Sequence, residues 1–578
     1  MDQTVLSQSF TDNSSNMEFE QRTWQYIPDS QNGSYNSGNI TFDLSPLSGS
    51  EQMVNYSEAV LTIPLVMNIS GNVAGTPTNA KLTANRLNAF AMNLKSYIHL
   101  IHSMSVQING VTYQNLCQFA NIDAHYKIIA GCSASEAQNL FPSLGYAKDD
   151  GVFSYYGDMT GANYGIGECN NSITGVVPAP TGGYGAQAVA TSNNYNSGRM
   201  ARCMMQAFDP TNTNYAKLVK STTELNNENK NYCASSNSAN EIVWYVLATI
   251  PLKFVSNLMA NLPLMKGAKL TLQIQTNTYN NVQLSVVGGG VCGYSKNLCS
   301  VSTNGTIPFQ LSPTMFTDTK YGLDVITTAN TQIIASIGIA KGYKTIANTW
   351  ATGQTNCRLY VPVYKLSPMT EQLLLTKAPV KHVVYNDLYS SILYNVLPDS
   401  QFTFTLPFLV AKPRYLLICP YLCSLNNGAD NPNSTAVTNG VIIGSPINSP
   451  FSSAPNTCTP FIQLTNFNCM LSGQAIYQQN VNYGWQQFQT ENRPSFAING
   501  GMTVGVSSGV ISELDYQNNG YNFVYVDLAR HSLATDNVSK NISIMGTNSA
   551  LVPIDLYVFC GYEKSFDISV LNGQIAQM

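Results

Sequence analysis

Histidine is the side chain best suited to holding a metal or moving a proton near neutral pH, and this chain has five: His99, His102, His125, His382 and His531. His99 and His102 are three residues apart, so on a helix they could face one metal ion. The apolar run around them also suits a strand, on which such positions point to opposite faces. No Asp or Glu follows before Asp123. We therefore interpret these histidines as core or interface residues and predict no metal site.

The thirteen cysteines form no pattern typical of a metal or redox site. Cys419 and Cys423 have three residues between them rather than two, and Cys292 and Cys299 flank a turn without a second pair at zinc spacing. Cys419 lies in a strand-like run, which predicts a buried apolar thiol. An odd number of cysteines in a large chain favours reduced thiols over a disulfide framework.

Two short segments of the sequence resemble enzyme motifs. Residues 505–509 read G-x-S-x-G around Ser507, but a hydrolase nucleophile needs a strand before it and a helix after it. Residues 510–512 read as a strand, and His531 stands in no α/β context, so a Gly/Ser turn is the better interpretation. The glycines at 288–290 lack the Lys and Ser/Thr of a phosphate-binding loop.

Acidic residues are sparse and scattered, and Asp149 with Asp150 falls in a loop-like stretch. A glycoside hydrolase needs two carboxylates that face each other across the sugar, and nothing in the sequence pairs them. These observations predict no catalytic residue, no cofactor site and no metal site. The chain is expected not to be an enzyme.

The composition points instead to a protein that packs against other proteins. Charged residues make up 10% of the 578, against about 25% in an average soluble domain. Asn, Ser, Thr, Gln and Tyr replace them, and interface cores are depleted in charge. The net charge is −4 and no Lys/Arg run occurs, so we expect no direct binding of nucleic acid. No secretory signal and no transmembrane helix are expected.

Short β-branched runs bounded by Gly, Pro, Asn or Ser dominate the chain and predict strands in a sandwich or barrel. The clearest strand candidates are residues 40–44, 59–69, 244–251, 270–275, 333–340, 358–364, 402–406, 415–420, 523–527 and 554–560. Helices are expected only at 114–129, 133–140, 254–262 and 369–377.

Three segments of the first half recur in the same order in the second half, which indicates an internal duplication. Residues 40–44 with 61–65 correspond to 402–406 with 417–421, and each second strand meets a proline. Residues 110–115 correspond to 473–480, and both lead into an aromatic stretch. Residues 244–252 with 270–275 correspond to 523–529 with 554–559. The alternative is one large β-domain whose strands have similar chemistry.

The repeats place the domain boundaries. Residues 1–37 are an N-terminal arm, 38–364 the first barrel, 365–379 a connector and 380–578 the second barrel. Two stretches rich in Gly, Asn and Ser, residues 145–241 and 425–460, interrupt the series of strand candidates and are predicted insertions. The first, also rich in Tyr, is expected to crown the outer face, because irregular backbone belongs at surfaces. Contact with a receptor is an open alternative for it.

The order of these segments resembles the major capsid proteins of virophages and polinton-like viruses. The resemblance is carried by residues 244–277, with Pro251-Leu252 and Pro263-Leu264, and by residues 358–423. The start at residues 21–24 and the turn at 108–110 are also similar. The resemblance implies an all-β double jelly roll: two tandem jelly-roll barrels with long loop insertions and a few short helices.

The function implied by the resemblance is that of a structural subunit. Such proteins form homotrimeric, pseudo-hexagonal capsomers that tile an icosahedral shell, so the implied location is the virion. The implied partners are the chain itself, neighbouring capsomers, and penton and minor capsid proteins; contact with an internal membrane stays open. Two alternatives are a glycan-binding adhesin or fibre-like surface protein, and a β-sandwich glycoside hydrolase.

Overall fold

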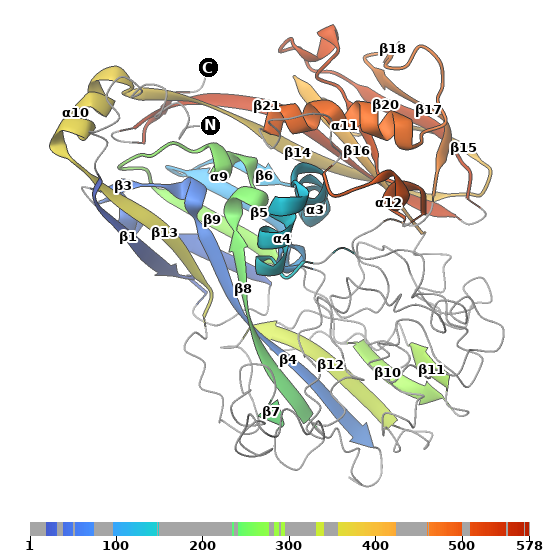
Figure 1. Ribbon diagram of the computed structural model, residues 1–578, viewed down its shortest axis with the longest axis horizontal. Helices are drawn as coiled ribbons and strands as arrows, with labels where there is room; N and C mark the ends of the chain where they lie inside the picture. The colour runs from blue at the N-terminus through green and yellow to red at the C-terminus, as the bar shows by residue number, and fades with distance from the viewer. Residues whose placement is uncertain are drawn as a thin grey trace.

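The structure is a computed structural model (Figure 1). It describes residues 19–31, 38–49, 52–73, 96–146, 148, 234–235, 241–276, 282–287, 291–294, 331–339, 356–422, 459, 462–499, 509–518, 520–550, 553–570 and 573–576. The predicted insertion at 425–460 lies outside these residues, apart from Thr459. Nearly all of the insertion at 145–241 also lies outside them, so its place on the outer face stays a prediction.

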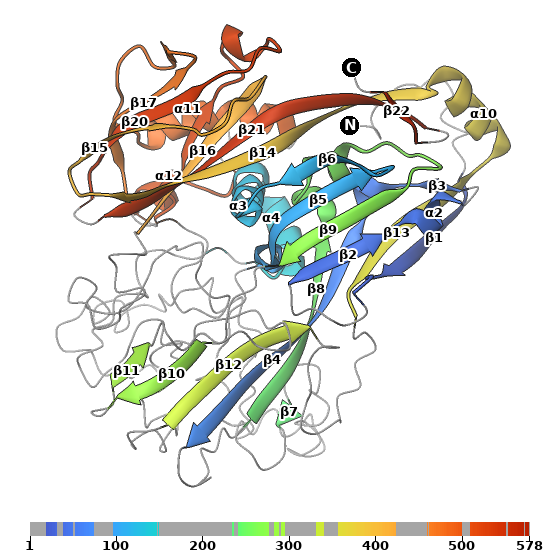
Figure 2. The ribbon, with the colours of Figure 1, turned by 180° about the vertical axis from the view of Figure 1, so that it is seen from behind.

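Eight strands of the first half form two facing sheets. One sheet has the order β1 (Phe19–Pro28), β13 (Arg358–Leu366), β4 (Val60–Val73), β8 (Glu241–Pro251). The other has the order β2 (Asn39–Asp43), β9 (Leu270–Thr276), β5 (Ile101–Ile108), β6 (Val111–Leu116), visible side by side in Figure 2. Numbered along this half, the orders are 1-8-3-6 and 2-7-4-5. This interleaving defines a jelly roll.

Eight strands of the second half repeat the same two orders. One sheet runs β14 (Val380–Val396), β21 (Ile554–Ser569), β16 (Pro413–Leu422), β19 (Val524–Asp527). The other runs β15 (Gln401–Thr405), β20 (Ile542–Asn548), β17 (Leu464–Leu471), β18 (Gln474–Ala475). The predicted fold class, an all-β double jelly roll, is therefore confirmed.

The remaining strands extend these sheets. β12 (Thr331–Ile339) pairs with the far part of β4 and with β10 (Val282–Val287), which pairs with β11 (Val291–Tyr294). Together they form the blade that projects below the first barrel in Figure 1. The short strands are β3 (Met53–Val54), β7 (Ala234–Ser235) and β22 (Ile575–Ala576).

The strand positions test the duplication directly. Residues 40–44 and 402–406 form the second strand of each barrel, and residues 61–65 and 417–421 lie in the third. Of the two correspondences in the third pair of segments, the first is confirmed and the second is wrong. Residues 244–252 and 523–529 share the sixth strand, but 270–275 is a seventh strand, whereas 554–559 lies in the eighth. The true seventh strand, β20, contains Gly546 and Asn548, so its apolar pattern is weaker than that of β21.

The hairpin between the fourth and fifth strands shows the repeat at single residues. Asn109 and Gly110 have φ of 52° and 83°, and Ser472 and Gly473 have φ of 50° and 83°. Positive φ at both loop residues is the type I′ turn that joins antiparallel strands, and it favours glycine at the second place. The two barrels therefore share a turn as well as a strand order.

Each barrel carries a pair of helices between its fifth and sixth strands. These are α3 (Ala120–Gly131) with α4 (Ala134–Ser143), and α11 (Trp485–Asn499) with α12 (Glu513–Asn518). The predicted helix at 114–129 began too early, because residues 114–116 belong to β6. The other predicted helices are found as α4, α9 (Asn257–Asn261) and α10 (Pro368–Lys377), whereas α11 and α12 were missed. The short elements are α2 (Ser45–Ser48), η1 (Tyr56–Glu58), η3 (Tyr97–Leu100), η5 (Leu252–Phe254) and η10 (Ser532–Ala534).

The predicted N-terminal arm needs a correction. Residues 19–28 are the first strand of the first sheet and pair with β13 from end to end. Within residues 20–28 only Ile27 is buried, because β1 is an edge strand with both faces largely exposed. The apolar alternation that identifies a strand is therefore absent from it.

The two barrels share one apolar core. A single cluster of buried side chains contains residues of both, among them Phe42, Ile63, Leu417 and Val558. The long strands β14 and β21 also run from the second barrel across the first toward α10, as Figures 1 and 2 both show. The second barrel is therefore packed against the first over a broad contact.

Candidate functional site at the junction of the two barrels

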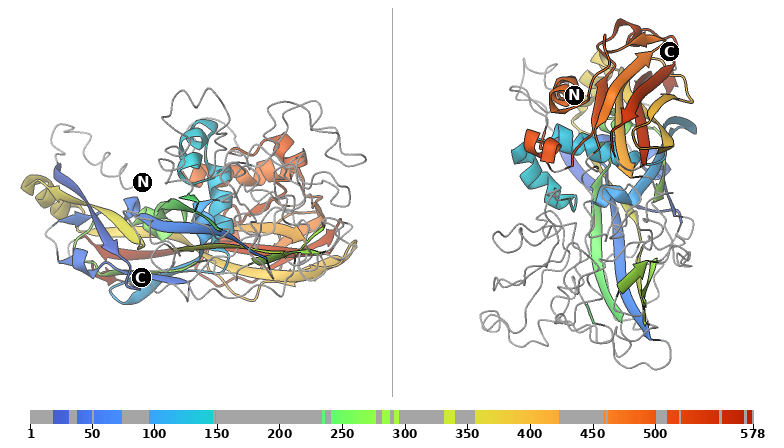
Figure 3. Two further views of the ribbon diagram at one scale, coloured as in Figure 1. Left: turned by 90° about the horizontal axis from the view of Figure 1, so that it is seen from below. Right: turned by 90° about the vertical axis from the view of Figure 1, so that its right-hand side faces the viewer.

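Helix α3 supplies the first group of contacts at this junction. It lies beside the helices of the second barrel in Figures 1 and 3, and Asp123 on it is 3% exposed. Its Oδ1 accepts a hydrogen bond of 2.8 Å from the Tyr415 hydroxyl on β16, and Lys127 Nζ lies 2.7 Å from its Oδ2. The Lys127 ammonium also stands 5.2 Å from the centroid of the Tyr415 ring. A buried carboxylate of one barrel is thus paired by the other.

Three tyrosine rings continue this contact. Tyr126 on α3 stacks on Tyr525 of β19 at 5.6 Å, and Tyr525 stacks on Tyr415 at the same centroid distance. The Tyr126 hydroxyl donates to Asn492 Oδ1 on α11 at 2.7 Å. Burial raises the pKa of Tyr126 and of Tyr415 well above the usual range, so both hydroxyls stay protonated donors.

The free edge of β14 is covered by amide side chains of the first barrel. Asn257 Oδ1 accepts from the Asn386 backbone N–H at 2.7 Å, and Gln114 Nε2 donates to the Asn386 carbonyl at 3.3 Å. Asn261 Nδ2 donates to the Val384 carbonyl at 3.0 Å. Backbone groups at a sheet edge need partners when they are buried, and here neutral amides satisfy them.

Aromatic side chains fill the space next to this edge. Tyr113 of β6 lies 4.7 Å from Phe566 of β21, ring centroid to ring centroid. The Tyr385 hydroxyl of β14 donates to the Tyr113 carbonyl at 2.5 Å, and burial raises the pKa of Tyr385 above its usual range. Phe119, at the start of α3, meets Tyr557 of β21 edge to face at 5.3 Å. Such pairs contribute packing and a fixed orientation.

The structure explains the last glycine of the G-x-S-x-G sequence, Gly509. Gly509 has φ of 71°, and a Cβ there would overlap the carbonyl oxygen of Ile129 on α3. The next residue, Val510, donates its backbone N–H to that oxygen at 2.9 Å. Residues 510–512 are not the predicted strand, because Ser512 caps α12. Ser507 lies outside the described residues.

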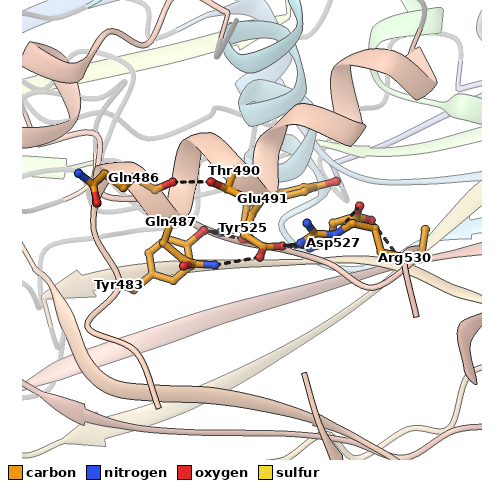
Figure 4. Close-up of polar contacts among 9 residues, drawn as sticks. Tyr483, Gln486, Gln487, Thr490, Glu491, Tyr525, Asp527 and Arg530 are labelled. Carbon is orange, nitrogen blue, oxygen red and sulfur yellow. Dashed lines mark hydrogen bonds and ion pairs between the residues drawn. The ribbon is translucent and has the colours of Figure 1, made fainter. Parts of the chain in front are cut away.

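A second cluster of buried charge lies under α11 (Figure 4). Glu491 is 2% exposed; its Oε2 accepts from the Asp527 backbone N–H at 3.0 Å and pairs with Arg530. Arg530 Nε also lies 3.3 Å from Asp527 Oδ2, so two buried carboxylates share one guanidinium. Burial raises the pKa of Asp527 to about 6, although Arg530 opposes the shift. The cluster ties α11 to the end of β19.

The histidines do not gather at one place. His99 lies against His125, with ring centroids 5.0 Å apart, whereas His102 lies edge to face on Phe119. His382 Nδ1 is 2.7 Å from Asp567 Oδ1 across β14 and β21. Burial and the neighbouring Arg530 lower the pKa of His531. Among the described residues, no group of three or more His, Cys, Asp or Glu is arranged to hold a metal ion.

The described cysteines are largely buried. Cys419 is fully buried in β16, as predicted, and burial raises its pKa well above the usual range. Burial also raises the pKa of Cys117 and of Cys469 to about 12, so these thiols stay protonated. Cys423, Cys299, Asp149, Asp150 and the glycines at 288–290 lie outside the described residues. No described helix is long and apolar enough to cross a membrane.

Phe119 and Tyr126 belong to the aromatic stretch that follows residues 110–115 in the sequence, but the sequence does not show that they lie between the barrels. The contacts of Asp123, Tyr415 and Asn492 at this junction were not predicted. The one available signal was a lone acid, Asp123, inside an apolar helical run, since a buried carboxylate needs a partner.

The fold defines the class: this chain is a double jelly-roll protein. No family model and no curated protein matches it in sequence. Among solved structures, a chain in the cryo-EM structure of the Sputnik virophage is similar with a TM-score of 0.50 and 12% identity. The similarity covers 96% of this chain and 88% of that one. At this identity the likeness concerns the fold.

Two further structures have lower scores. The mavirus major capsid protein has a TM-score of 0.44 and 11% identity, over 98% of this chain and 92% of that one. The Faustovirus major capsid protein has a TM-score of 0.38 and 11% identity, over 96% and 92%.

Proposed function

We propose that this chain is a structural major capsid protein that forms homotrimers and tiles an icosahedral shell. The observation that carries the proposal is the pair of jelly rolls with identical strand order, packed on one continuous core. Three such chains present six similar barrels, and a block with near-hexagonal outline can tile a surface with one gene product. A virophage structure with the same fold supports this role.

The buried polar contacts fit a structural role better than catalysis. Asp123 and Glu491 are each held by a fixed partner, with Asp123 bonded to Tyr415 and Glu491 to Arg530. The large barrels close most of their strand edges, which suits a protein made at high concentration. The proposed packing units are residues 19–366 and 380–576, joined through α10.

The proposed location is the virion, and the proposed partners are other copies of the chain, with penton and minor capsid proteins at special positions. The net charge of −4 supports a shell that does not bind nucleic acid directly. No metal or cofactor is needed in this proposal.

Light scattering on the purified chain, with and without a chelator, tests the assembly. We expect a homotrimer in both conditions, and negative-stain images with hexagonal blocks. A chain that is monomeric at every concentration, or that dissociates on chelation, contradicts the proposal. A monomer that binds a glycan array would favour the adhesin alternative.

A further inference from the structure

We propose that strand β1 of one copy receives the β18 side of the second barrel of another copy, head to tail. The β1 face comprises Arg22, Trp24 and Tyr26 with Arg358 and Tyr360 of β13. The amide side comprises residues 472–490, from the hairpin before β18 into α11. This inference rests on the proposed function and names the surfaces that join the copies.

The contact inside the chain provides the precedent. β14 is the first strand of the second barrel, and its free edge is covered by the first barrel's β6 and α9. Gln114, Asn257 and Asn261 provide the amides that bond its backbone. The first strand of one barrel therefore docks against the fifth-strand side of the other through neutral amides.

β1 holds the same place in the first barrel, but no strand or amide of the described residues covers its edge in this way. Among the described residues it pairs only with β13, so one edge of its ten residues is open. Trp24 is 49% exposed and Tyr26 is 55% exposed. The Arg22 guanidinium lies 5.3 Å from the Trp24 ring centroid, and that of Arg358 lies 4.7 Å from the Tyr26 ring centroid. These stacked cations hold the rings in an ordered ladder.

The amide side is the matching surface on the second barrel. Residues 472–490 contain no charged side chain. Their exposed amides are those of Gln474, Gln478, Gln479, Asn480, Asn482, Gln486 and Gln489. They follow the same hairpin turn as Gln114 in the first barrel. An uncharged amide surface is suited to the polar backbone edge and the aromatic rings of β1.

The two surfaces lie at opposite ends of the molecule. β1 is at one end and β18 is at the other in both Figure 1 and Figure 2. A contact between them cannot form within one chain, so it must join two copies. Such a head-to-tail contact gives a closed ring when the rotation between copies closes. It also removes the open edge of β1, which would otherwise invite irregular strand pairing.

The first test compares two matched tyrosines. Tyr26→Glu places a charge on the β1 face, and Tyr394→Glu, at 56% exposure, places one on a surface outside it. We expect Tyr26→Glu to weaken association at least about tenfold, whereas Tyr394→Glu leaves it unchanged. Analytical ultracentrifugation measures association. Circular dichroism melting of both variants checks folding, which substitution at half-exposed sites should preserve.

The second test uses complementation between two variants. Gln478→Glu combined with Gln479→Glu breaks the amide side and leaves β1 intact. Alone, it and Tyr26→Glu should each be monomeric. Mixed in equal amounts they should form a one-to-one dimer, because each retains the surface that the other has lost. Gln401→Glu, an exposed amide on β15, is the control and should assemble like the natural chain.

The outcomes separate this inference from the proposed function. If the natural chain assembles and both variants keep its size, the copies join elsewhere and only this inference is wrong. If only Tyr26→Glu is monomeric, β1 joins a surface other than the amide side and the head-to-tail contact proposed here is wrong. A natural chain that never assembles contradicts the proposed function and this inference together.

Discussion

The helices α3 and α11 stand at the same place in the two barrels, yet their surroundings differ. α3 carries Asp123 and Tyr126 into the second barrel, where they bond Tyr415 and Asn492. α11 lies on its own strand β19, and its Glu491 turns inward to Arg530. Its other side presents Gln486 and Gln489 to solvent.

This difference shows how the two barrels of a duplicated fold come to expose different surfaces. The same strand order is used twice, but α3 is held between the barrels, whereas α11 meets the first barrel at Asn492 and keeps Gln486 and Gln489 exposed. Because the fifth-strand side of the first barrel is occupied, the same side of the second barrel is the one left for another chain. Four pairs of substitutions test how much each region depends on its contacts.

The largest effect is expected at Gly561, in β21. A Cβ there would overlap the ring of Tyr415, which is held by Asp123 and cannot move away. Gly561→Ala should lower the free energy of unfolding by about 3 kcal/mol, measured by urea denaturation. Gly546→Ala in β20 is the control. Its Cβ would lie 3.0 Å from the tip of the Phe402 ring, which can shift, so a cost near that of Gly561→Ala would contradict this account.

The Tyr415 hydroxyl tests the junction itself. Tyr415→Phe removes one of the two donors to Asp123 and leaves only Lys127, and bonds to charged groups contribute about 2 kcal/mol. Tyr516→Phe is the matched control, because its hydroxyl donates to a neutral carbonyl, that of Phe523, within the second barrel. We expect a loss of about 1 kcal/mol there. Equal losses in urea denaturation would mean that the junction is no stronger than an ordinary buried contact.

The cluster under α11 should respond to pH. The folded pKa of Asp527, about 6, lies above the unfolded value of about 3.9, so the folded state binds the proton more tightly. Stability from this group is therefore gained as pH falls through 6 and lost as pH rises. Glu491, Arg530 and Arg414 are the charged groups whose electrostatic interactions act on it, and His531 lies near Glu491 and Arg530.

The measurement is the free energy of unfolding of the natural chain and of Asp527→Asn. Relative to the variant, the natural chain should gain about 1 kcal/mol between about pH 7.5 and about pH 5. Asp536→Asn, at an exposed position, serves as the control. A natural chain that loses stability against Asp527→Asn on acidification would contradict the buried-acid account.

The smallest effect compares the caps of α4 and α12. Ser133 Oγ accepts from the Glu136 N–H at 3.3 Å, and Ser512 Oγ accepts from the Asp515 N–H at 3.2 Å. Ser133→Ala should cost about 0.5 kcal/mol, measured by thermal unfolding. Ser512→Ala should cost about 1 kcal/mol, since Asp515 is buried and pairs with Lys148. The reverse order would show that the junction does not reinforce α12.

Local signals were sufficient for much of the fold. The β-branched runs, the two repeated strand pairs and the glycine turns at 110 and 473 identified two tandem barrels, because strand propensity and turn geometry depend on neighbouring residues. The edge strand β1 was not predicted because both of its faces are largely exposed, so it lacks an apolar alternation. Helix α11 was not predicted because it is rich in Gln and contains Pro494, so it depends on tertiary packing for its stability.

The sequence by itself determined that there are two barrels, where most of their strands lie, and that charge is scarce. Only the tertiary structure decided which barrel surface is buried inside the chain. Tyr415 and Asp123 are 292 residues apart, and no local pattern links them. Their contact exists because the two sheets bring α3 over β16 and β19, where the Tyr415 hydroxyl joins Lys127 in pairing a buried carboxylate.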